Sequence, residues 1–497
     1  MDCINVGMIG CGRISDLHFK AMDQLPGLRL RAVCDLDPEL ARQKKAQWGA
    51  DRAYTDYREM LRDSTVDAVE ILSPQSVHTA MTLDAARAGK HIALQKPMTT
   101  DLKNADEILA GVRKAGVRFK VTDNYLFYPP IQLAKSLIDQ GEIGTPSGLR
   151  IKLITAGSGG WEVPADAWKW RLAEKEAGRG FQTFDHGHHL WTTAWYLLGE
   201  VERVSAWIDS LDGIIDSPAV FHWKYKGQIA YGSCDFVHCP EMEMPSDYYA
   251  NDEWLEITGS KGIIVIPRCT GQIRRGPGVR LFSQGKWQEF NTVETDWASG
   301  FVGAAANFRD TIQGEAKPML SGEQARDILR LSLAMARSAT TRREIYPEEL
   351  DSPWGRFYSL WQQKKDQGLS LNPLKHIPWG GKKEAALAGQ ARELTCAMLE
   401  RFDAEAAGDW EGCIGICLTA QGGAGESAFC LRVKDGKADL REGEVPEEAQ
   451  LTLSVPAGTW AAILLGQKRI ETALLQGRLK LSGKAELGLK LRSVFGI

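Results

Sequence analysis

The stretch INVGMIGCGRIS, residues 4–15, decides the fold of the first part of this 497-residue chain. Its apolar start has the pattern of a β-strand, and the strand runs directly into a turn that holds Gly10 and Gly12. Gly10 permits the tight turn, whereas Gly12 allows a phosphate to approach the backbone N–H groups at the positive end of the helix that follows. The third small position of this fingerprint is Ser15. The pattern predicts a strand, turn and helix that bind a dinucleotide.

The same alternation of strand and helix continues through residues 1–122. Apolar strands are expected at 28–35, 67–73 and 91–97, and amphipathic stretches of helical length separate them. Strands separated by helices form parallel units with right-handed crossovers, which build a doubly wound sheet. The sequence therefore predicts an α/β Rossmann domain over residues 1–122.

A carboxylate at the end of the second expected strand bears on the choice of cofactor. Asp35 lies 25 positions after Gly10. At that place its side chain can accept hydrogen bonds from the adenosine ribose hydroxyls, and it would repel a 2′-phosphate. We therefore expect the cofactor to be NAD rather than NADP.

The pattern changes beyond residue 122. Residues 123–350 contain long alternating segments with turn signals, which are typical of antiparallel strands, and one helix is expected at about 181–198. We predict an α+β domain with an open, mostly antiparallel sheet for residues 123–350. A linker rich in Pro, Gly and Lys is expected at 351–385, and a small α+β domain at 386–497.

The bulk composition gives no reason to expect nucleic acid or a membrane as a partner. The chain has a formal net charge of −4, with 43% hydrophobic and 25% charged residues, which is ordinary for a globular protein. No apolar run reaches the roughly 18 residues that a membrane-spanning helix needs. The N-terminus lacks the basic segment of a secretory signal, and the ten cysteines include no C-x-x-C pair. We expect a cytoplasmic protein with reduced thiols.

A lysine follows the apolar part of the strand expected at 91–97. Lys96 and Pro97 stand at the carboxyl edge of the predicted sheet, where ligands bind in open α/β folds. A lysine at that edge can exchange a proton with a substrate hydroxyl. A solvated lysine without a chemical role is the alternative.

The stretch FDHGHH, residues 184–189, concentrates titratable groups. On a helix, Asp185 and His189 lie four positions apart and share a face, with His188 beside them. This arrangement suits acid/base catalysis. For His186 alone, we expect a structural or surface role.

A metal site is the competing interpretation of this stretch. Asp185, His188 and His189, with His238 or Cys239, have the chemistry of zinc or manganese ligands. Adjacent histidines on a helix point about 100° apart, so that His188 and His189 do not converge easily. The metal alternative stays open at this point, and our prediction is that no metal binds.

Five motifs in this order resemble one known family, the glucose-fructose oxidoreductase, inositol dehydrogenase and rhizopine-catabolism (Gfo/Idh/MocA) oxidoreductases. The resemblance covers about residues 1–345. It implies a Rossmann domain followed by an α/β domain whose open sheet supports the substrate site and often an oligomer interface. The motifs are GCGRIS (10–15), LSPQSVH (72–78), LQKP (94–97), NYLFYPP (124–130) and FDHGHH (184–189).

The resemblance also implies which residues form the site. It makes Lys96, Asp185 and His189 catalytic, with His189 as the general acid/base, and Gln95 stands where the family has Glu before its Lys-Pro pair. A loop around Trp168 is implied to close over nicotinamide and substrate. The cofactor-binding residues expected from the glycine turn and the family are Gly10, Gly12, Arg13, Ile14, Ser15, Asp35, Ser73, Pro74, His78, Gln95, Lys96 and Asn124. The expected substrate-binding residues are Lys96, Trp168, Trp170, Arg171, Asp185, His188 and His189.

The last part of the chain resembles the sterol-carrier-protein-type domain. The resemblance rests on an LTLS strand, an apolar helix and the stretch LLQGRLKLSGK, and covers about residues 390–497. It implies a tunnel that holds a lipid or acyl chain. An oligomerisation or lid element without a ligand is the alternative, because apolar residues at helical spacing more often form an ordinary core.

Together these observations predict an NAD-dependent oxidoreductase, a dehydrogenase acting on CH–OH groups. We expect it to transfer hydride between nicotinamide and a secondary alcohol of a sugar, cyclitol or glycoside. One alternative is an NAD-dependent glycosidase that uses transient oxidation, elimination and re-reduction. Another is a non-catalytic protein that senses NAD or lipid. The expected partners are a small carbohydrate-like substrate, a lipid in the C-terminal domain, and further copies of the chain in a dimer or tetramer.

Overall fold

The computed structural model describes two compact units, residues 1–356 and 357–497. Most of the predicted linker, 351–385, lies outside the described residues, so that its structure stays a prediction. The domain boundary expected at residue 122 also stays a prediction, because residue 122 lies inside the first compact unit. The residues that the structure describes are 3–211, 213–351, 381–420, 425–484 and 487–496.

The first sheet of the first unit confirms the predicted doubly wound fold. Its six strands are all parallel and lie in the order β3-β2-β1-β4-β5-β6. Two short strands were missing from the sequence-based prediction, namely β3 with three residues and β6 with four. The strands are β1 (Ile4–Ile9), β2 (Leu28–Cys34), β3 (Arg52–Tyr54), β4 (Ala68–Ile71), β5 (His91–Gln95) and β6 (Phe119–Thr122).

Local sequence signals set the ends of the helices between these strands. Helix α2 begins at Pro38, where the side chain of Asp37 accepts hydrogen bonds from the N–H groups of Glu39 and Leu40. It ends at Trp48 and is followed by Gly49, whose φ of +66° permits the left-handed cap. The helices are α1 (Ser15–Asp23), α2 (Pro38–Trp48), α3 (Tyr57–Arg62), α4 (Gln75–Arg87) and α5 (Leu102–Ala115).

The second sheet of this unit has eight strands in the order β14-β13-β12-β11-β7-β10-β9-β8. All neighbours are antiparallel except β7 and β10, which pair in parallel, so that the predicted mostly antiparallel sheet is confirmed. Its strands are β7 (Pro146–Ser158), β8 (Val201–Ile208), β9 (Ala219–Tyr225), β10 (Tyr231–Glu243), β11 (Asn251–Gly259), β12 (Gly262–Ile266), β13 (Val279–Ser283) and β14 (Lys286–Phe290).

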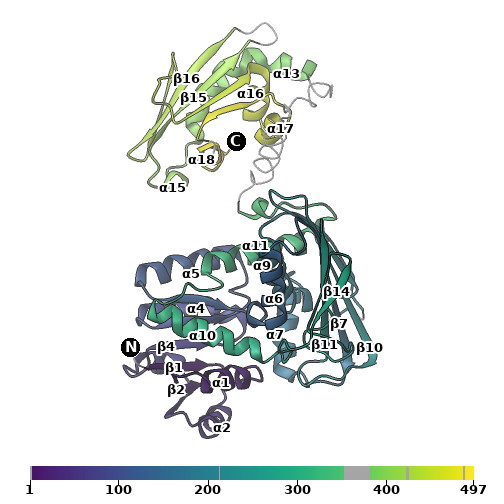
Figure 1. Cartoon of the computed structure of the whole chain (residues 1–497). Coiled ribbons are helices and arrows are strands. Elements are labelled where there is room, and N and C mark those ends of the chain that lie inside the picture. The colour runs from purple at the N-terminus through teal and green to yellow at the C-terminus, as the bar shows by residue number, and fades with distance from the viewer. Residues whose placement is uncertain (1–2, 212, 352–380, 421–424, 485–486, 497) are drawn as a thin grey trace. The chain divides into compact units, whose positions relative to one another are not determined.

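Helices pack between the two sheets and join them into one hydrophobic core. Figure 1 shows α6, α9 and α11 against one face of the eight-stranded sheet. Ile71 and Leu94 of the parallel sheet belong to the same buried cluster as Trp191 and Phe221 of the second part. Because this buried cluster contains residues of both parts, it holds the C-terminal end of β5 in a fixed position relative to α9. The elements are η1 (Asn124–Phe127), α6 (Pro129–Asp139), α7 (Ala165–Glu176), α8 (Gln182–Asp185), α9 (Gly187–Leu198), α10 (Ser299–Gln313), α11 (Gly322–Thr341) and η2 (Pro347–Leu350).

Two predictions of local structure were wrong in detail. The single helix expected at about 181–198 is divided into α8 and α9, which meet at His186. The segment expected to be a loop around Trp168 forms helix α7.

The second unit folds around its own five-stranded sheet, in the order β17-β16-β15-β18-β19. Every residue of α16 is buried, which explains the strongly apolar sequence AGTWAAIL. The strands are β15 (Gly412–Thr419), β16 (Ser427–Lys434), β17 (Lys437–Glu442), β18 (Leu451–Pro456) and β19 (Lys480–Gly483). The helices are α13 (Gly381–Leu387), η4 (Ala388–Gln390), α14 (Ala391–Ala397), η5 (Met398–Arg401), α15 (Ala404–Ala407), α16 (Ala457–Leu464), α17 (Ile470–Leu475) and α18 (Leu487–Phe495).

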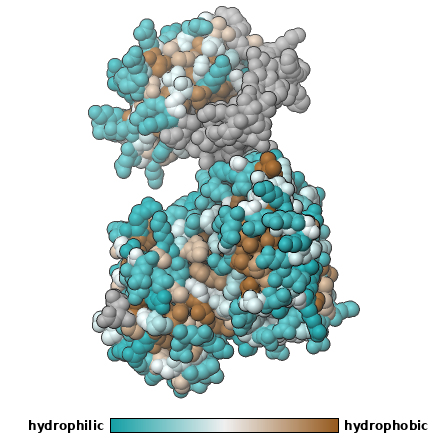
Figure 2. Space-filling model, viewed as in Figure 1, coloured by the Kyte–Doolittle hydropathy of each residue, from teal (hydrophilic) through white to brown (hydrophobic). Residues whose placement is uncertain are grey.

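The visible surface is mainly polar. On the face shown in Figure 2, hydrophilic residues cover most of the surface and hydrophobic residues form smaller patches. Leu36, Ile229 and Trp207 are among the large apolar side chains that are exposed. Within the described ranges, no helix has the length and apolar character needed to cross a membrane.

Candidate active site

The glycine turn after β1 has the geometry of a phosphate cradle. Gly10 adopts a φ of +96°, and a Cβ added there would lie 3.0 Å from the carbonyl carbon and oxygen of Leu72. A Cβ on Gly12 would instead project into open space. A phosphate can therefore approach the backbone at Gly12, and the turn fits a dinucleotide. Ser15 is buried, and its hydroxyl donates a hydrogen bond to the Gly12 carbonyl, which closes the first turn of α1.

Asp35 lies directly beside this turn. Its Oδ2 accepts a hydrogen bond from the Cys11 N–H at 2.8 Å, and its Oδ1 accepts one from the Asp37 N–H at 3.0 Å. The carboxylate is thus held at the end of β2, in the position expected for contacts to a ribose. Ile14 precedes α1 and packs against the core, while the guanidinium of Arg13 lies 5.4 Å from the centre of the Trp161 ring.

His78 lies beneath the loop after β4 rather than at its surface. The side chain is 1% exposed, with Nε2 2.8 Å from the Ser73 carbonyl oxygen and Nδ1 2.9 Å from the Pro97 carbonyl oxygen. The imidazole therefore ties the segment around Ser73 and Pro74 to the segment after β5. From this place, His78 would act on a cofactor through the loops that it positions.

Gln95 orients the backbone of the predicted catalytic lysine. Its Oε1 accepts a hydrogen bond from the Lys96 N–H at 2.8 Å. Its amide nitrogen lies 3.0 Å from Nε2 of His18, whose Nδ1 is 2.9 Å from Glu70 Oε1. The residue that differs from the resembled family therefore belongs to a buried chain of polar contacts.

The structure brings Lys96, Asp185 and Arg171 together. Lys96 Nζ donates to Asp185 Oδ1 and to the Asp185 carbonyl oxygen, both at 2.9 Å. Arg171 donates to the other carboxylate oxygen, from Nε at 3.0 Å and from Nη2 at 2.9 Å. Burial alone would raise the pKa of Asp185, but the two cations hold that pKa far below its usual value. Asp185 is therefore ionised, and it fixes the lysine at the end of β5.

The carboxylate bonded to His189 is Asp123, not Asp185. His189 Nδ1 lies 2.7 Å from Asp123 Oδ1, which also accepts a hydrogen bond from the Tyr125 N–H at 3.1 Å. Burial lowers the pKa of His189, although Asp123 opposes this effect. Burial by itself raises the pKa of Asp123, but His189 and Lys96 bring the pKa below its usual value. A neutral imidazole beside an ionised carboxylate is the arrangement of a general base.

The other two histidines of the stretch have separate partners. His188 is 2% exposed, and its Nδ1 donates to the Phe184 carbonyl oxygen at 2.6 Å. Burial lowers the pKa of His188 to about 4, so that it is neutral. His186 Nε2 lies 2.7 Å from Oε1 of Glu253, a buried residue of β11.

The aromatic residues expected near the substrate lie on α7. Trp168 is 37% exposed and packs on Phe181, with 5.1 Å between the ring centres. The ring of Trp170 lies 4.3 Å from the guanidinium of Arg171. Asn124 is buried at the start of η1, and its amide nitrogen has no hydrogen-bond partner among the described residues. Its place next to Asp123 puts it at the same end of the parallel sheet.

The described residues offer no cluster of side chains that would support the metal alternative. Among the described residues, no group of three or more His, Cys, Asp or Glu side chains is arranged to hold a metal ion. Both oxygens of Asp185 are instead bonded to the cations of Lys96 and Arg171. The geometry thus favours proton transfer and hydrogen bonding at this site.

Sequence reasoning missed the two carboxylates that support the histidines. A signal for Asp123 was present, because it follows the apolar segment of β6 and so stands at the carboxyl edge of the parallel sheet. Glu253 carried no such signal, since it lies within an ordinary alternating strand. Its contact with His186 spans 67 positions of the chain.

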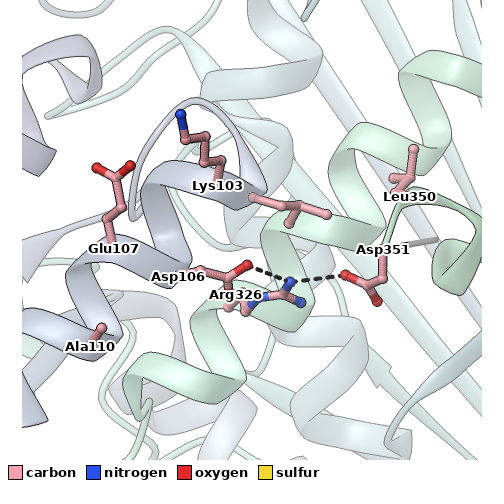
Figure 3. Close-up of a pocket in the computed structure, with 8 residues that line it drawn as sticks. Lys103, Asp106, Glu107, Ala110, Arg326, Leu350 and Asp351 are labelled. Atoms are coloured by element: carbon pink, nitrogen blue, oxygen red, sulfur yellow. Dashed lines mark hydrogen bonds and ion pairs between the residues drawn. The ribbon is translucent and has the colours of Figure 1, made fainter. Parts of the chain in front are cut away.

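A surface groove of about 520 Å³ lies apart from these residues (Figure 3). Arg326 bridges Asp106 of α5 and Asp351 within it. Charged side chains dominate its walls, and none of the predicted site residues lines it. We assign it no part in the chemistry. Its lining residues are Leu102, Lys103, Asp106, Glu107, Ala110, Arg326, Leu350 and Asp351.

Comparison with known families agrees with this architecture. Residues 4–123 match the oxidoreductase family with an NAD-binding Rossmann fold, GFO/IDH/MocA, and residues 131–265 match the GFO/IDH/MocA C-terminal domain. Residues 397–496 match the SCP-2 sterol transfer family. These matches confirm both resemblances inferred from the sequence motifs.

Individual proteins with similar sequences agree with these family matches. Myo-inositol 2-dehydrogenase of Thermotoga maritima is 26% identical over 70% of this chain and 99% of its own length. Levoglucosan dehydrogenase of Pseudarthrobacter phenanthrenivorans is 30% identical over 41% of this chain and 54% of its own length. The chain spans about half the length of three curated relatives that share 30% identity or more with it.

The fold also matches solved structures. An oxidoreductase from Agrobacterium radiobacter, in complex with NAD⁺, L-tartaric acid and magnesium, superposes with a TM-score of 0.60 at 19% identity. The match covers 69% of this chain and 98% of that chain. At this identity the likeness establishes the fold of the first unit.

Proposed function

Because the first unit of this chain belongs to the GFO/IDH/MocA oxidoreductase family, we propose that the protein is an NAD-dependent dehydrogenase that acts on a secondary alcohol. One observation carries the proposal. The ammonium group of Lys96, at the end of β5, and the His189–Asp123 pair, from α9 and the end of β6, lie at the same edge of the parallel sheet. That edge is where open α/β folds bind their ligands.

The residues of the glycine turn suit NAD as the cofactor. Gly10 and Gly12 form the phosphate cradle, and Asp35 offers a carboxylate to the ribose hydroxyls. Arg13, Ser73, Pro74 and Asn124 border the same end of the sheet and are proposed to contact the cofactor. The chemistry that a bound NAD would supply is acceptance of a hydride from the carbon that carries the reacting hydroxyl.

His189 is proposed to take the hydroxyl proton. Its Nδ1–H is bonded to Asp123, so that Nε2 carries the lone pair that can accept a proton. The positive charge that forms on the imidazole is stabilised by the ionised Asp123. Lys96 is proposed to donate a hydrogen bond to the reacting oxygen, and the Asp185 carboxylate keeps its ammonium group in place.

The substrate class is proposed to be a sugar, cyclitol or glycoside. Myo-inositol and levoglucosan dehydrogenases are among the relatives, and these names support a polyhydroxylated ring. Trp168, which is 37% exposed on α7, supplies an aromatic surface for the apolar face of such a ring.

The proposal is tested by a substrate screen. Purified protein is incubated with NAD and a panel of inositols, sugars and glycosides, while NADH absorbance and released aglycone are measured together. NADH formation with at least one polyol is the expected result, and its loss in Lys96→Met ties it to this site. Aglycone release without net NADH would replace net oxidation by the redox-neutral glycosidase reaction. If neither signal appears with any compound, the dehydrogenase proposal is wrong.

For the second unit we propose an apolar ligand such as a lipid. The match of residues 397–496 to the SCP-2 sterol transfer family supports it. Mass spectrometry of lipids extracted from the purified full chain tests this proposal. An extract without stoichiometric lipid, before and after incubation with fatty acid vesicles, would favour an oligomerisation or lid role.

The first unit is proposed to form a homo-oligomer through the eight-stranded sheet. Trp207, Tyr231 and Trp287, which all lie on this sheet, are 61%, 55% and 45% exposed. Aromatic side chains on a sheet face are typical of protein interfaces. Light scattering of the purified chain should give the mass of a dimer or tetramer, and Trp207→Glu should lower that mass.

A further inference from the structure

His186 forms a second imidazole–carboxylate pair that the proposed oxidation does not require. The side chain of Glu253 is completely buried, and it accepts four hydrogen bonds. Its Oε1 accepts from the Tyr125 hydroxyl at 2.9 Å, from His186 Nε2 at 2.7 Å and from Asn251 Nδ2 at 2.8 Å. Its Oε2 accepts from the Thr270 hydroxyl at 2.9 Å.

This environment fixes the tautomer of His186. Burial alone would raise the pKa of Glu253, but its hydrogen bonds, first of all the one from His186, bring the pKa below its usual value. An ionised carboxylate only accepts hydrogen bonds, so that the proton of a neutral His186 is on Nε2. Nδ1 then presents a lone pair. Among the described residues, no hydrogen bond to this Nδ1 is found, and the His186 side chain is 19% exposed.

The exposed part of His186 belongs to the candidate active site. Its ring centre lies 5.5 Å from that of His189, and the ring of Tyr125 packs against both imidazoles. The side chains of His189, Lys96 and Asp185 are 10%, 11% and 15% exposed, close to the value for His186. The supporting carboxylates of Asp123 and Glu253 are 0% exposed. The site thus presents two imidazoles to a ligand and keeps their carboxylates behind them.

We propose that Nδ1 of His186 accepts a hydrogen bond from a second substrate hydroxyl, next to the one that is oxidised. The proposal rests on the dehydrogenase function and narrows its substrates to vicinal diols. Two neighbouring hydroxyls of a polyol can reach the two rings, one at His189 Nε2 and one at His186 Nδ1. A hydroxyl is a good donor to an imidazole lone pair. A bound substrate that lacks this hydroxyl would leave Nδ1 without a hydrogen-bond partner, which weakens binding.

A kinetic comparison tests the role in recognition. Initial rates are measured for myo-inositol and for monodeoxy-inositols that lack a hydroxyl beside the oxidised carbon, with wild-type protein and His186→Phe. The wild type should prefer the diol by about 2- to 12-fold in kcat/KM, the effect of one hydrogen bond between neutral groups. His186→Phe should abolish this preference, mainly through KM. His222→Phe, at an exposed histidine of β9, should leave it unchanged.

A conservative variant separates recognition from folding. In His186→Gln the amide N–H can still donate to Glu253, and the amide oxygen can accept from a hydroxyl. We expect His186→Gln to recover at least part of the diol preference. If a folded His186→Phe variant keeps the full preference for the diol, the proposed role of His186 is wrong, whereas the dehydrogenase function still stands. No NADH from any polyol with the wild type would overturn the dehydrogenase function, and with it this use of His186.

A measurement independent of turnover tests the tautomer itself. The full chain is labelled with ¹⁵N-histidine, and long-range ¹H–¹⁵N spectra are recorded at pH 7. The signals that disappear in His186→Gln identify His186. We expect a protonated Nε2 and an unprotonated Nδ1. A protonated Nδ1 would overturn the proposal, because that nitrogen could not then accept a hydrogen bond.

Discussion

Replacing Asp123 with asparagine should shift the acid limb of the pH–rate profile to lower pH. His189 must be neutral to accept the hydroxyl proton, so that activity is lost as falling pH protonates it. The Asp123 carboxylate, 2.7 Å from Nδ1, raises the pKa of His189 against the larger effect of burial. An opposite charge at such a distance changes a pKa by about 1 to 3 units. Without it, the His189 pKa should fall by that amount.

The plateau rate should also decrease. A shift of about 1 to 3 pKa units corresponds to about 1.4 to 4 kcal/mol of lost stabilisation of the imidazolium form of His189. If the proton is about half transferred in the transition state, kcat/KM falls by roughly 3- to 30-fold. The asparagine oxygen can still accept from His189 and from the Tyr125 N–H, so that the geometry is retained. The amide nitrogen of the new asparagine would occupy the place of Asp123 Oδ2, which has no hydrogen-bond partner among the described residues. Because this buried N–H group would also lack an acceptor, the substitution should lower stability by about 1–3 kcal/mol.

The assay records NADH formation from pH 5 to 9 for the polyol found in the screen. Asp252→Asn is the matched control, since Asp252 is a buried aspartate whose Oδ1 accepts hydrogen bonds from the N–H groups of Cys269 and Gly271. Thermal melting and NAD binding verify that each variant is folded. An acid limb that stays in place or moves to higher pH in a folded Asp123→Asn would refute the assignment of His189 as the base.

Three further predictions test other parts of the molecule. Lys96→Met should lower kcat by about 10²- to 10⁴-fold and leave the NAD affinity, measured by fluorescence titration, within a few-fold of the wild type. Asp35→Ser should weaken NAD binding by about 10- to 100-fold, because a charge-assisted hydrogen bond to the ribose is removed. It should also raise the relative affinity for NADP, because the charge that repels the 2′-phosphate is removed. Unchanged selectivity between NAD and NADP in calorimetric titrations would contradict this. Glu384→Ala should destabilise the second unit by about 1.5 to 3 kcal/mol in calorimetry, since Lys468 and Arg478 lose their shared carboxylate, while dehydrogenase activity stays unchanged.

Local patterns were sufficient to predict the fold and the place of Lys96. The glycine turn and the alternation of apolar strands with amphipathic helices are signals of short range, and they specify a parallel sheet. Once the sheet is parallel, a residue that follows β5 must stand at its carboxyl edge. That is where the structure has Lys96, within 2.9 Å of Asp185 from a segment 89 positions away.

The partners of the histidines could not be predicted in the same way. Helical periodicity placed Asp185 and His189 on one face, and His186, between α8 and α9, keeps helical backbone angles. The two side chains nevertheless have different partners, since Asp185 is bonded to Lys96 and Arg171, and His189 to Asp123. Such pairings depend on how the two sheets pack, and no pattern within a single segment carries that information.

The replacement of Glu by Gln at position 95 illustrates how packing compensates for a departure from a motif. The Gln95 amide nitrogen faces His18 Nε2, so that this ring nitrogen must be the acceptor and Nδ1 the donor to Glu70. The same amide group then presents its oxygen to the Lys96 N–H. A glutamate at this position could accept from the Lys96 N–H, but it could not donate to His18 Nε2. Glu70, on the neighbouring strand, is linked to the Lys96 N–H through His18 and Gln95. Gln95 is thus the residue that can bond to both His18 and the Lys96 N–H, and the lysine keeps its place without a charge next to it in sequence.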